Sequence, residues 1–463
     1  MEFIYRLKQM ILAAGDMASY LAGLAIALSI RNLSVPSFAL IERHLPLFLT
    51  VFAFWVVINY INGLYDLVRV RNDLASYRRL FETAAVSLAV GIAFFYLIPE
   101  RAITPKTILL LTVATGYGAS ALWRFVYNLA IGHRRFRTNV LFVGFTRETE
   151  ELITLLDKEP GKGYRVVAVV DGNASREIPK YESVDVYRSA KTIRPAITNH
   201  KVQLVVIAPH LKTDSEVLRE LYELLFWPVS MMDLSTFYEL VTGRIPESTF
   251  SETWFLEHFR NTEHPLYDKF RALVDMVSGV MLGVVFLALL PLIGLGIMLT
   301  SPGPIFFRQK RIGRFGKEFT LYKFRSMYAL SKDGSAELEG AQFAKKKDMR
   351  VTPIGKLLRK TRLDEMPQVI NLLKRDITLI GPRPERPEIV SQLTDRTPYY
   401  PLRHVVLPGL TSWAVLHQNY TDTMETSLQK LQYDLYYIKN RSLLLDLSIL
   451  LRTINVIVRM RGQ

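Results

Sequence analysis

The chain has 463 residues, enough for about three domains at roughly 100 to 200 residues each, which excludes a single small binding module. It carries 58 Lys and Arg against 43 Asp and Glu, a net charge of +15, and 49% of its residues are hydrophobic. The absence of cysteine from the sequence excludes disulfides, thiolate metal sites and a cysteine nucleophile. The eight histidines show no metal-binding spacing, so polar chemistry must rest on carboxylates, hydroxyls and cations.

Four long apolar runs fill most of the first 130 residues. The length of each run approaches the about 20 residues that a helix needs to cross a hydrocarbon core. Asp16 is the only charged residue inside the runs. Buried core helices are the alternative, but four runs in succession predict a bundle of four transmembrane helices over residues 1–130. A signal peptide is disfavoured because three more runs follow the first. The runs are roughly Ile11–Ile30, Leu47–Ile61, Ala84–Ile98 and Thr107–Ala121.

The segments that flank these runs are alternately rich and poor in Lys and Arg along the chain. Because Lys and Arg prefer the cytoplasmic side, the asymmetry places the N-terminus and everything after about residue 125 in the cytoplasm. The remaining two loops carry only Arg31 and Arg43, then Arg101 and Lys106. The residues counted as cytoplasmic are Arg6, Lys8, Arg69, Arg71, Arg78, Arg79, Arg124, Arg134, Arg135 and Arg137.

Residues 138–260 change to short β-branched runs that alternate with helical stretches, near 147–158 and 214–225, and this predicts a Rossmann-like α/β domain. A dinucleotide site needs several glycines where the first strand turns into its helix, and here Gly144 stands alone. A structural or regulatory role is therefore favoured over cofactor binding. The predicted strands are Asn139–Gly144, Tyr164–Asp171 and Val202–Ala208.

A fifth apolar run, Met276–Leu299, has 24 residues without a charge and could span a bilayer. Basic residues flank it on both sides, and a crossing would carry the rest of the chain to the outer face. Pro291 lacks an N–H and kinks a helix. We therefore predict a re-entrant hairpin within residues 266–300, bent near Leu290–Pro291; a plain span with a tolerated kink is the alternative.

The next 75 residues, 301–375, hold 18 basic and 7 acidic residues, so +11 of the net charge lies there. Interleaved aromatic residues would also suit nucleic acid. Because the stretch directly follows a membrane segment, where cations attract lipid headgroups, a phosphate-bearing lipid or nucleotide is the better prediction.

Two adjacent carboxylates, Asp364 and Glu365, open a predicted helix over Arg362–Lys374. Pro367 is tolerated there because the first helical N–H groups have no partner in the helix. An acid at this position is also an ordinary helix start. Nearby cations and the helix N-terminus favour the ionised acid, which suits a nucleophile or a hard-cation ligand.

Prolines on both sides of an arginine mark the segment Ile380–Pro387. Pro382 and Pro384 restrict the backbone around Arg383, whose guanidinium can grip phosphate oxygens in a forked geometry. A rigid surface turn is the alternative. Downstream, Leu407–Trp413 predicts a turn followed by a strand or short helix. The spacing in Ser442–Met460 predicts an amphipathic helix on the membrane surface or against the core.

From residue 270 to residue 460 the sequence resembles the bacterial polyprenyl-phosphate hexose-1-phosphate transferases, in their long form. The four apolar runs and the Rossmann-like domain are similar too, and Ser235–Gly243 resembles that domain's end. The resemblance implies a mixed α/β catalytic domain over residues 301–463. It rests on motifs in Ser301–Gly313, Lys323–Met327, Asp348–Thr352, Arg359–Glu365, Gly381–Pro384, Pro408–Thr411 and Tyr433–Lys439.

The resemblance implies transfer of a sugar 1-phosphate from a UDP-sugar to undecaprenyl phosphate at the inner leaflet, with release of UMP. In this family Asp364 would attack the β-phosphorus, Glu365 would support catalysis, and Mg²⁺ would bind Asp364. The implied partners are these substrates and membrane lipid, with a homodimer and no nucleic acid, in the bacterial inner membrane. The implied phosphate-binding residues are Arg383 and Arg359, then Lys323, Arg325 and Arg308.

Ser412 and Val415 depart from the residues common in this family, Gly and Gln, and leave the identity of the donor sugar open. Two other functions remain open from the residues alone. A membrane-anchored nucleotide-sugar epimerase or dehydratase would use the Rossmann-like domain, where Tyr187 and Lys191 have a suitable spacing. A non-enzymatic scaffold for polysaccharide assembly would explain the basic charge but not the carboxylate pair.

Overall fold

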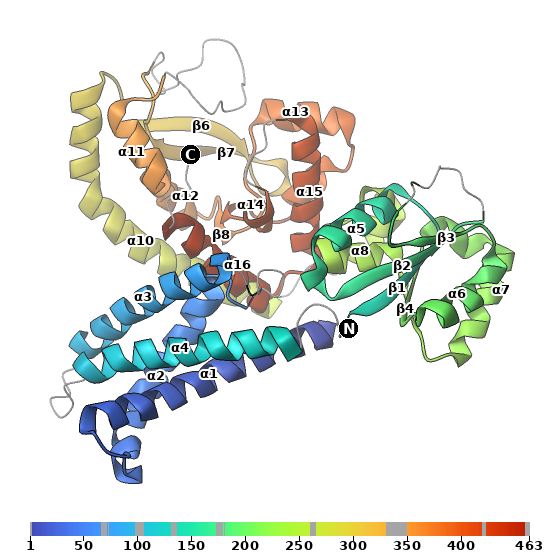
Figure 1. The fold of residues 1–463 in the computed structure, drawn as a ribbon. Coiled ribbons are helices and arrows are strands. Elements are labelled where there is room, and N and C mark those ends of the chain that lie inside the picture. The colour runs from blue at the N-terminus through green and yellow to red at the C-terminus, as the bar shows by residue number, and fades with distance from the viewer. Residues whose placement is uncertain are drawn as a thin grey trace. The chain divides into compact units, whose positions relative to one another are not determined.

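The chain folds into two compact units, Met1–Val241 and Thr242–Gln463. The computed structural model describes residues 2–65, 72, 74–97, 106–130, 137–172, 179, 181–259, 265–329, 350–418 and 423–458. The first unit holds long N-terminal helices and a parallel sheet; the second holds one long apolar helix and a mixed α/β region (Figure 1).

Long apolar helices form the N-terminal part of the first unit. Each predicted run lies inside one of them, except for Ile98, which is outside the described residues. Large apolar side chains such as Leu21, Ile26 and Val57 remain exposed on their surfaces. Together with the α/β sheet that follows, these helices fit a membrane protein. They are α1 (Glu2–Asn32), α2 (Phe38–Ile61), α3 (Leu74–Leu97) and α4 (Lys106–Ala130).

The carboxylate of Asp16 is fully buried and is bound by polar side chains of α4. Arg124 of α4 donates to both of its carboxylate oxygens, and Ser120 donates to Oδ1 at 2.6 Å. Arg124 was counted above among cytoplasmic loop residues, but it lies within α4 and is 6% exposed. Arg69, Arg71, Arg134 and Arg135, which also supported the orientation, lie outside the described residues.

The α/β sheet has five parallel strands in the order β3-β2-β1-β4-β5. This is the order of a doubly wound fold, so the predicted Rossmann-like topology is present. The apolar cluster on one face includes α5 and α8, and that on the other includes α6 and α7 (Figure 1). The strands are β1 (Thr138–Val143), β2 (Tyr164–Val170), β3 (Asp185–Tyr187), β4 (Leu204–Ile207) and β5 (Ser230–Asp233); the helices are α5 (Arg147–Lys158), α6 (Ile193–His200), α7 (Ser215–Glu223) and α8 (Leu234–Thr242).

The turn from β1 to α5 passes through Gly144, whose φ of 101° favours glycine. A Cβ atom there would lie 2.6 Å from the Cβ of Ala208. The next backbone N–H, of Phe145, donates to the carboxylate of Asp171 at 3.2 Å. A side chain of the protein thus occupies a donor that a pyrophosphate would need.

The long apolar helix α10 (Pro265–Thr300) is continuous, with Pro291 inside it, so the chain does not break into two helices at this proline. The helix nevertheless changes direction along its length (Figure 1). Phe286, Ile293 and Ile297 pack into the same apolar cluster as side chains of the α/β region. With α1–α4, α10 is one of five helices in the described residues that are long and apolar enough to cross a membrane.

The rest of the second unit surrounds two small sheets. The antiparallel pair is β6 (Phe306–Ile312) and β7 (Glu318–Phe324), and the parallel pair is β8 (Thr378–Ile380) and β9 (Gly409–Thr411). At Leu407–Trp413, where a turn followed by a strand or a short helix was predicted, the structure has strand β9, and a short helix begins at Trp413. The helices are α9 (Glu252–Phe259), α11 (Pro353–Thr361), α12 (Val369–Leu373), α13 (Pro387–Arg396), α14 (Trp413–His417), α15 (Met424–Lys439) and α16 (Leu443–Val458).

One domain boundary differs from the expectation. Residues 242–259 group with the second unit, because Ile245 and Phe255 join its apolar core.

Helix α16 is amphipathic as predicted: Ile449 is fully buried, whereas Leu444 is 73% exposed. One face therefore packs against the core and another leaves apolar side chains uncovered within the described part of the chain.

Candidate functional site

Asp364 and Glu365 lie in a 3-10 turn, Leu363–Gln368, between α11 and α12. Arg362 ends α11 in the left-handed region, with φ 60°, and so turns the chain into this segment. Leu363 and Met366, three residues apart, pack against the core cluster that holds α10. The predicted helix is therefore present, but its opening turn is the tighter 3-10 form.

Glu365 is held by cations from two other segments. Lys323 of β7 donates to Oε1 at 2.9 Å, and Arg383 donates to the same oxygen. Burial alone would raise the pKa of Glu365, but Arg383 and Lys323 outweigh it and hold that pKa well below its usual range. Glu365 is therefore a fixed negative charge that aligns two cations.

Asp364 has a different environment. Its Oδ1 is shielded from solvent and has no hydrogen-bond partner among the described residues. Burial raises the pKa of Asp364 and the charge of Glu365 adds to this, while Lys323 and Arg359 act in the opposite direction. The sequence alone predicts that the nearby cations favour ionisation of both acids. In the structure, Lys323 and Arg383 bind Glu365, so the pKa values of the two acids separate.

The loop that carries Arg383 is held through its backbone carbonyl groups. The carbonyl oxygen of Pro382 accepts from the N–H of Gly409 at 3.0 Å. Arg403 donates to the carbonyl oxygen of Arg383 at 2.8 Å, and Arg311 donates to that of Pro384 at 3.1 Å. Satisfying these groups fixes the backbone, so the prolines and the hydrogen bonds together aim Arg383.

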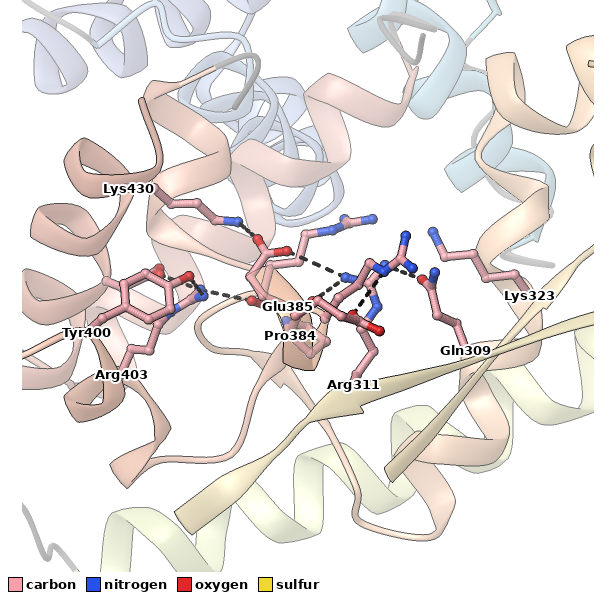
Figure 2. Close-up of polar contacts among 12 residues, drawn as sticks. Gln309, Arg311, Lys323, Pro384, Glu385, Tyr400, Arg403 and Lys430 are labelled. Carbon is pink, nitrogen blue, oxygen red and sulfur yellow. Dashed lines mark hydrogen bonds and ion pairs between the residues drawn. The ribbon is translucent and has the colours of Figure 1, made fainter. Parts of the chain in front are cut away.

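A network of buried charges supports this loop (Figure 2). Glu385 lies between Lys430 and Arg311, and its pKa falls to about 2 because these cations and Arg403 outweigh the effect of burial. Arg403 also pairs with Asp434 at 2.7 Å, and both side chains are 1% exposed.

No role in the site was predicted for these residues, although Arg311, Glu385 and Asp434 lie in or beside the quoted motifs. One signal was available: Asp434 is an acid in the otherwise apolar and aromatic sequence Tyr433–Ile438. An acid in such a helix needs a buried partner. That partner, Arg403, is distant in the sequence and belongs to none of the motifs.

The other predicted phosphate-binding residues divide into two groups. Arg359 lies near Asp364 and donates to Ser326 Oγ at 2.9 Å. Arg325 is 1% exposed and donates to the backbone carbonyls of Ser301 and Pro302, so it anchors the end of α10. Arg308 is exposed beside the ring of Tyr322, on the face of the β6–β7 pair opposite Lys323. The structure thus brings together Asp364, Glu365, Lys323, Arg359 and Arg383, but not Arg325 or Arg308.

The residues suggested for an epimerase or dehydratase are engaged differently. Tyr187 shares a hydrogen bond of 3.0 Å with His200, and Lys191 is exposed. Ser412, a position left open for the donor sugar, is buried and accepts from the N–H of Val415 at 3.2 Å, as an N-cap of α14. This hydroxyl therefore stabilises the start of α14.

The fit of a magnesium ion can be judged from the carboxylates. Within the described ranges, no group of three or more His, Cys, Asp or Glu side chains could hold a metal ion. Mg²⁺ often binds through only one or two carboxylates and takes its other oxygens from water and substrate phosphates. The uncommitted Oδ1 of Asp364, beside cations that suit phosphate, fits such an ion.

Comparisons with known proteins cover both halves of the chain. Residues 266–460 match the family described as bacterial sugar transferase, and residues 60–232 match one described as CoA-binding domain. A UDP-N-acetylgalactosamine-undecaprenyl-phosphate N-acetylgalactosaminephosphotransferase of Aeromonas hydrophila is 42% identical over 194 residues, 42% of this chain and 45% of that protein. The match thus spans less than half the length of that relative.

Two proteins named UDP-glucose:undecaprenyl-phosphate glucose-1-phosphate transferase are also similar. The protein of Klebsiella pneumoniae is 28% identical over 381 residues, 80% of this chain and 79% of the relative. That of Caulobacter vibrioides is 39% identical over 186 residues, 40% of this chain and 68% of the relative. With the matched domains and the carboxylate site, these similarities establish that the chain belongs to the bacterial sugar transferase family, in its long form.

Proposed function

We propose that this protein transfers a sugar 1-phosphate from a UDP-sugar to undecaprenyl phosphate and releases UMP, as the first step of exopolysaccharide or O-antigen assembly. The observation that carries the proposal is the division of labour between two adjacent carboxylates. Glu365 is bound to Lys323 and Arg383, whereas Asp364 keeps an uncommitted oxygen beside them. Relatives named for this reaction support the choice of substrates.

The proposed reaction has two displacements at one phosphorus atom. A carboxylate oxygen of Asp364 bonds to the β-phosphorus as the bond to the bridging oxygen breaks, and UMP leaves with that electron pair. An oxygen of the lipid phosphate then attacks the same phosphorus and releases Asp364. This division keeps the two anionic substrates from meeting in one transition state.

Cations around the carboxylates would hold the phosphate groups. Arg383 and Lys323 already point at one carboxylate oxygen, so the donor's phosphate oxygens would share or replace Glu365 as their partner. Arg359, which acts on the charge of Asp364, would be a third contact. A bound Mg²⁺ would supply positive charge against the developing charge on the donor phosphates.

On this proposal the protein is a homodimer in the bacterial inner membrane, with four transmembrane helices and a cytoplasmic catalytic region. Helix α10 enters the membrane and returns to the same side. A straight helix of 36 residues would be about 54 Å long, well beyond a core of about 30 Å. Asp275 near one end contacts Thr378, and Ile297 near the other packs against the same α/β region. Both ends therefore contact one folded unit.

A topology measurement tests the re-entrant path. A reporter fused after Gln463 should be active only in the cytoplasm, because a helix that returns to its own side leaves the C-terminal residues there. The matched control is the same reporter fused after Gly144, in the α/β domain before α10. Opposite locations for the two reporters would contradict the path.

The reaction is tested with purified protein, undecaprenyl phosphate and a panel of UDP-sugars, by measuring UMP release and lipid product together. At least one donor should give equal amounts of both products. An absence of UMP release with every donor would overturn the proposed function. The donor that works would identify the sugar, which the names of the relatives leave open between glucose and N-acetylgalactosamine.

Replacing Glu365 by Gln should change both the rate and its pH dependence. Because Asp364 acts as a carboxylate, the rate falls as the pH drops through its pKa, which lies above the ordinary 3.8. Removing the neighbouring charge lowers that pKa, so the acid limb of the profile moves to lower pH. The maximal rate falls about 10- to 100-fold, because Arg383 and Lys323 lose the partner that aligns them.

Rate profiles from about pH 4 to pH 9 check this result. The matched control is Glu388→Gln, since Glu388 is a 58% exposed acid on α13 that pairs with Arg386. This control should keep both the rate and the limb. An acid limb that moves to higher pH in Glu365→Gln would contradict the assignment.

A further inference from the structure

Strand β8 is paired with β9 on one edge only. The N–H of Thr378 donates to Pro408 and that of Gly381 donates to Thr411, each at 2.9 Å. On the other edge, the N–H of Leu379 and the carbonyl of Ile380 face no strand among the described residues. Backbone groups left in this way need another partner.

The membrane helix α10 supplies that partner through two side chains. Asp275 accepts from the N–H of Leu379 at 3.0 Å and from the hydroxyl of Thr378 at 2.6 Å. Arg271 donates to the carbonyl oxygen of Ile380. One acceptor and one donor thus complete the open edge of β8 as a neighbouring strand would.

These side chains belong to a stripe along one face of α10. Residues four apart in a helix lie on the same side, and Tyr267, Arg271, Asp275 and Gly279 follow this spacing. Tyr267 donates to Asp446 of α16 at 2.7 Å, and a Cβ atom on Gly279 would lie 2.9 Å from Leu373. The stripe faces the α/β region, whereas neighbouring apolar side chains of α10 are exposed: Met276, Val277, Val280 and Met281.

The strand held in this way leads directly to the site. Only Gly381 and Pro382 separate β8 from Arg383. The backbone of both residues is restricted. Pro382 has a fixed φ, and Gly381 is packed so closely that a Cβ atom on it would lie 2.5 Å from the carbonyl oxygen of Leu407. A displacement of β8 would therefore be passed to Arg383.

We propose that Asp275 and Arg271 are positioning residues, which bind the strand that carries Arg383 to the membrane helix and so fix the height of Arg383 at the bilayer surface. This inference rests on the proposed function for its kinetic readout. In this proposal α10 has a second role besides anchoring the protein, because its side chains hold the strand that leads to Arg383.

The kinetic test is a double-mutant cycle between Asp275 and Arg383. Asp275→Ala should lower kcat for UMP release by about 10- to 100-fold while KM for the donor changes less than about threefold, because the phosphate-binding side chain is misplaced but present. Asp275→Asn keeps an acceptor for Leu379 and should recover most of the rate. In an Arg383→Lys background, Asp275→Ala should cost less than about threefold.

A physical readout makes the test independent of activity. Hydrogen exchange of the peptide 376–386 should accelerate in Asp275→Ala, since the N–H of Leu379 loses its acceptor. If Asp275→Ala does not fold, Thr378→Val removes one contact and leaves the acid in place. The matched control is Asp268→Asn, also on α10, whose side chain is 45% exposed and pairs with Arg441.

The outcomes separate the two proposals. An inactive wild-type protein would overturn the proposed function, and the exchange rates would then decide the positioning role. Full activity and unchanged exchange in folded Asp275→Ala or Thr378→Val would overturn the positioning role alone. So would an equal loss of rate in the wild-type and Arg383→Lys backgrounds, because a general structural defect acts in both.

Discussion

Asp364→Asn is expected to abolish UMP release and lipid product together, with a loss of at least about 1,000-fold. Asn has nearly the same shape as Asp but cannot form the ester to the donor phosphorus. Stability should stay the same or increase, because Oδ1 of Asp364 is buried without a hydrogen-bond partner among the described residues and burial penalises its charge. Rates of both products and the thermal unfolding midpoint are the measurements.

Asp395→Asn is the matched control, since Asp395 is an exposed acid on α13. It should leave both rates unchanged. Mass spectrometry of enzyme quenched during turnover should show a hexose phosphate on the peptide that contains Asp364. A folded Asp364→Asn protein that keeps more than a few per cent of the rate would remove the nucleophile assignment.

The second large effect is expected from Arg403→Met. This change removes the partner of Asp434 and the donors to Tyr400 and to the backbone of Arg383. Breaking a buried ion pair by removing one partner costs about 3–5 kcal/mol, because the remaining charge stays buried. In a unit of this size the unfolding midpoint should fall by roughly 10 °C, which calorimetry can measure.

Arg403→Met/Asp434→Leu should regain much of the lost stability, since both charges are then removed. Arg396→Met, at an exposed arginine on α13, provides the control and should not shift the midpoint. Equal midpoints for Arg403→Met and the wild type would show that the pair contributes nothing to folding.

Local patterns were enough to predict part of the fold. The runs that became β1, β2 and β4 are rich in β-branched residues and buried on both faces, so they are recognisable without their neighbours. The three residues of β3 are too short for such a pattern, and β5 is as long as β4 but contains no β-branched residue. Their place in the sheet depends on pairing with β2 and β4.

The site was predictable where chemistry is carried by a motif, and less so where it depends on geometry. Lys323, Glu365 and Arg383, which were singled out in three separate motifs, are joined by ion pairs in the structure. Arg325, two residues from Lys323, binds backbone carbonyls instead, and only its buried environment reveals this. Arg311 and Glu385 are 74 residues apart, so no local pattern could pair them.

The pairing of Asp16 with Arg124 has a consequence for biogenesis. The two residues are 108 positions apart, so the first helix is synthesised well before its counter-ion exists. An isolated acid at the centre of a lipid-embedded segment costs about 2.5–3.5 kcal/mol on insertion scales. If the first helix spans the membrane as proposed, we expect it to stay beside the translocon or an insertase until the fourth emerges, and Asp16→Leu to release it into lipid earlier.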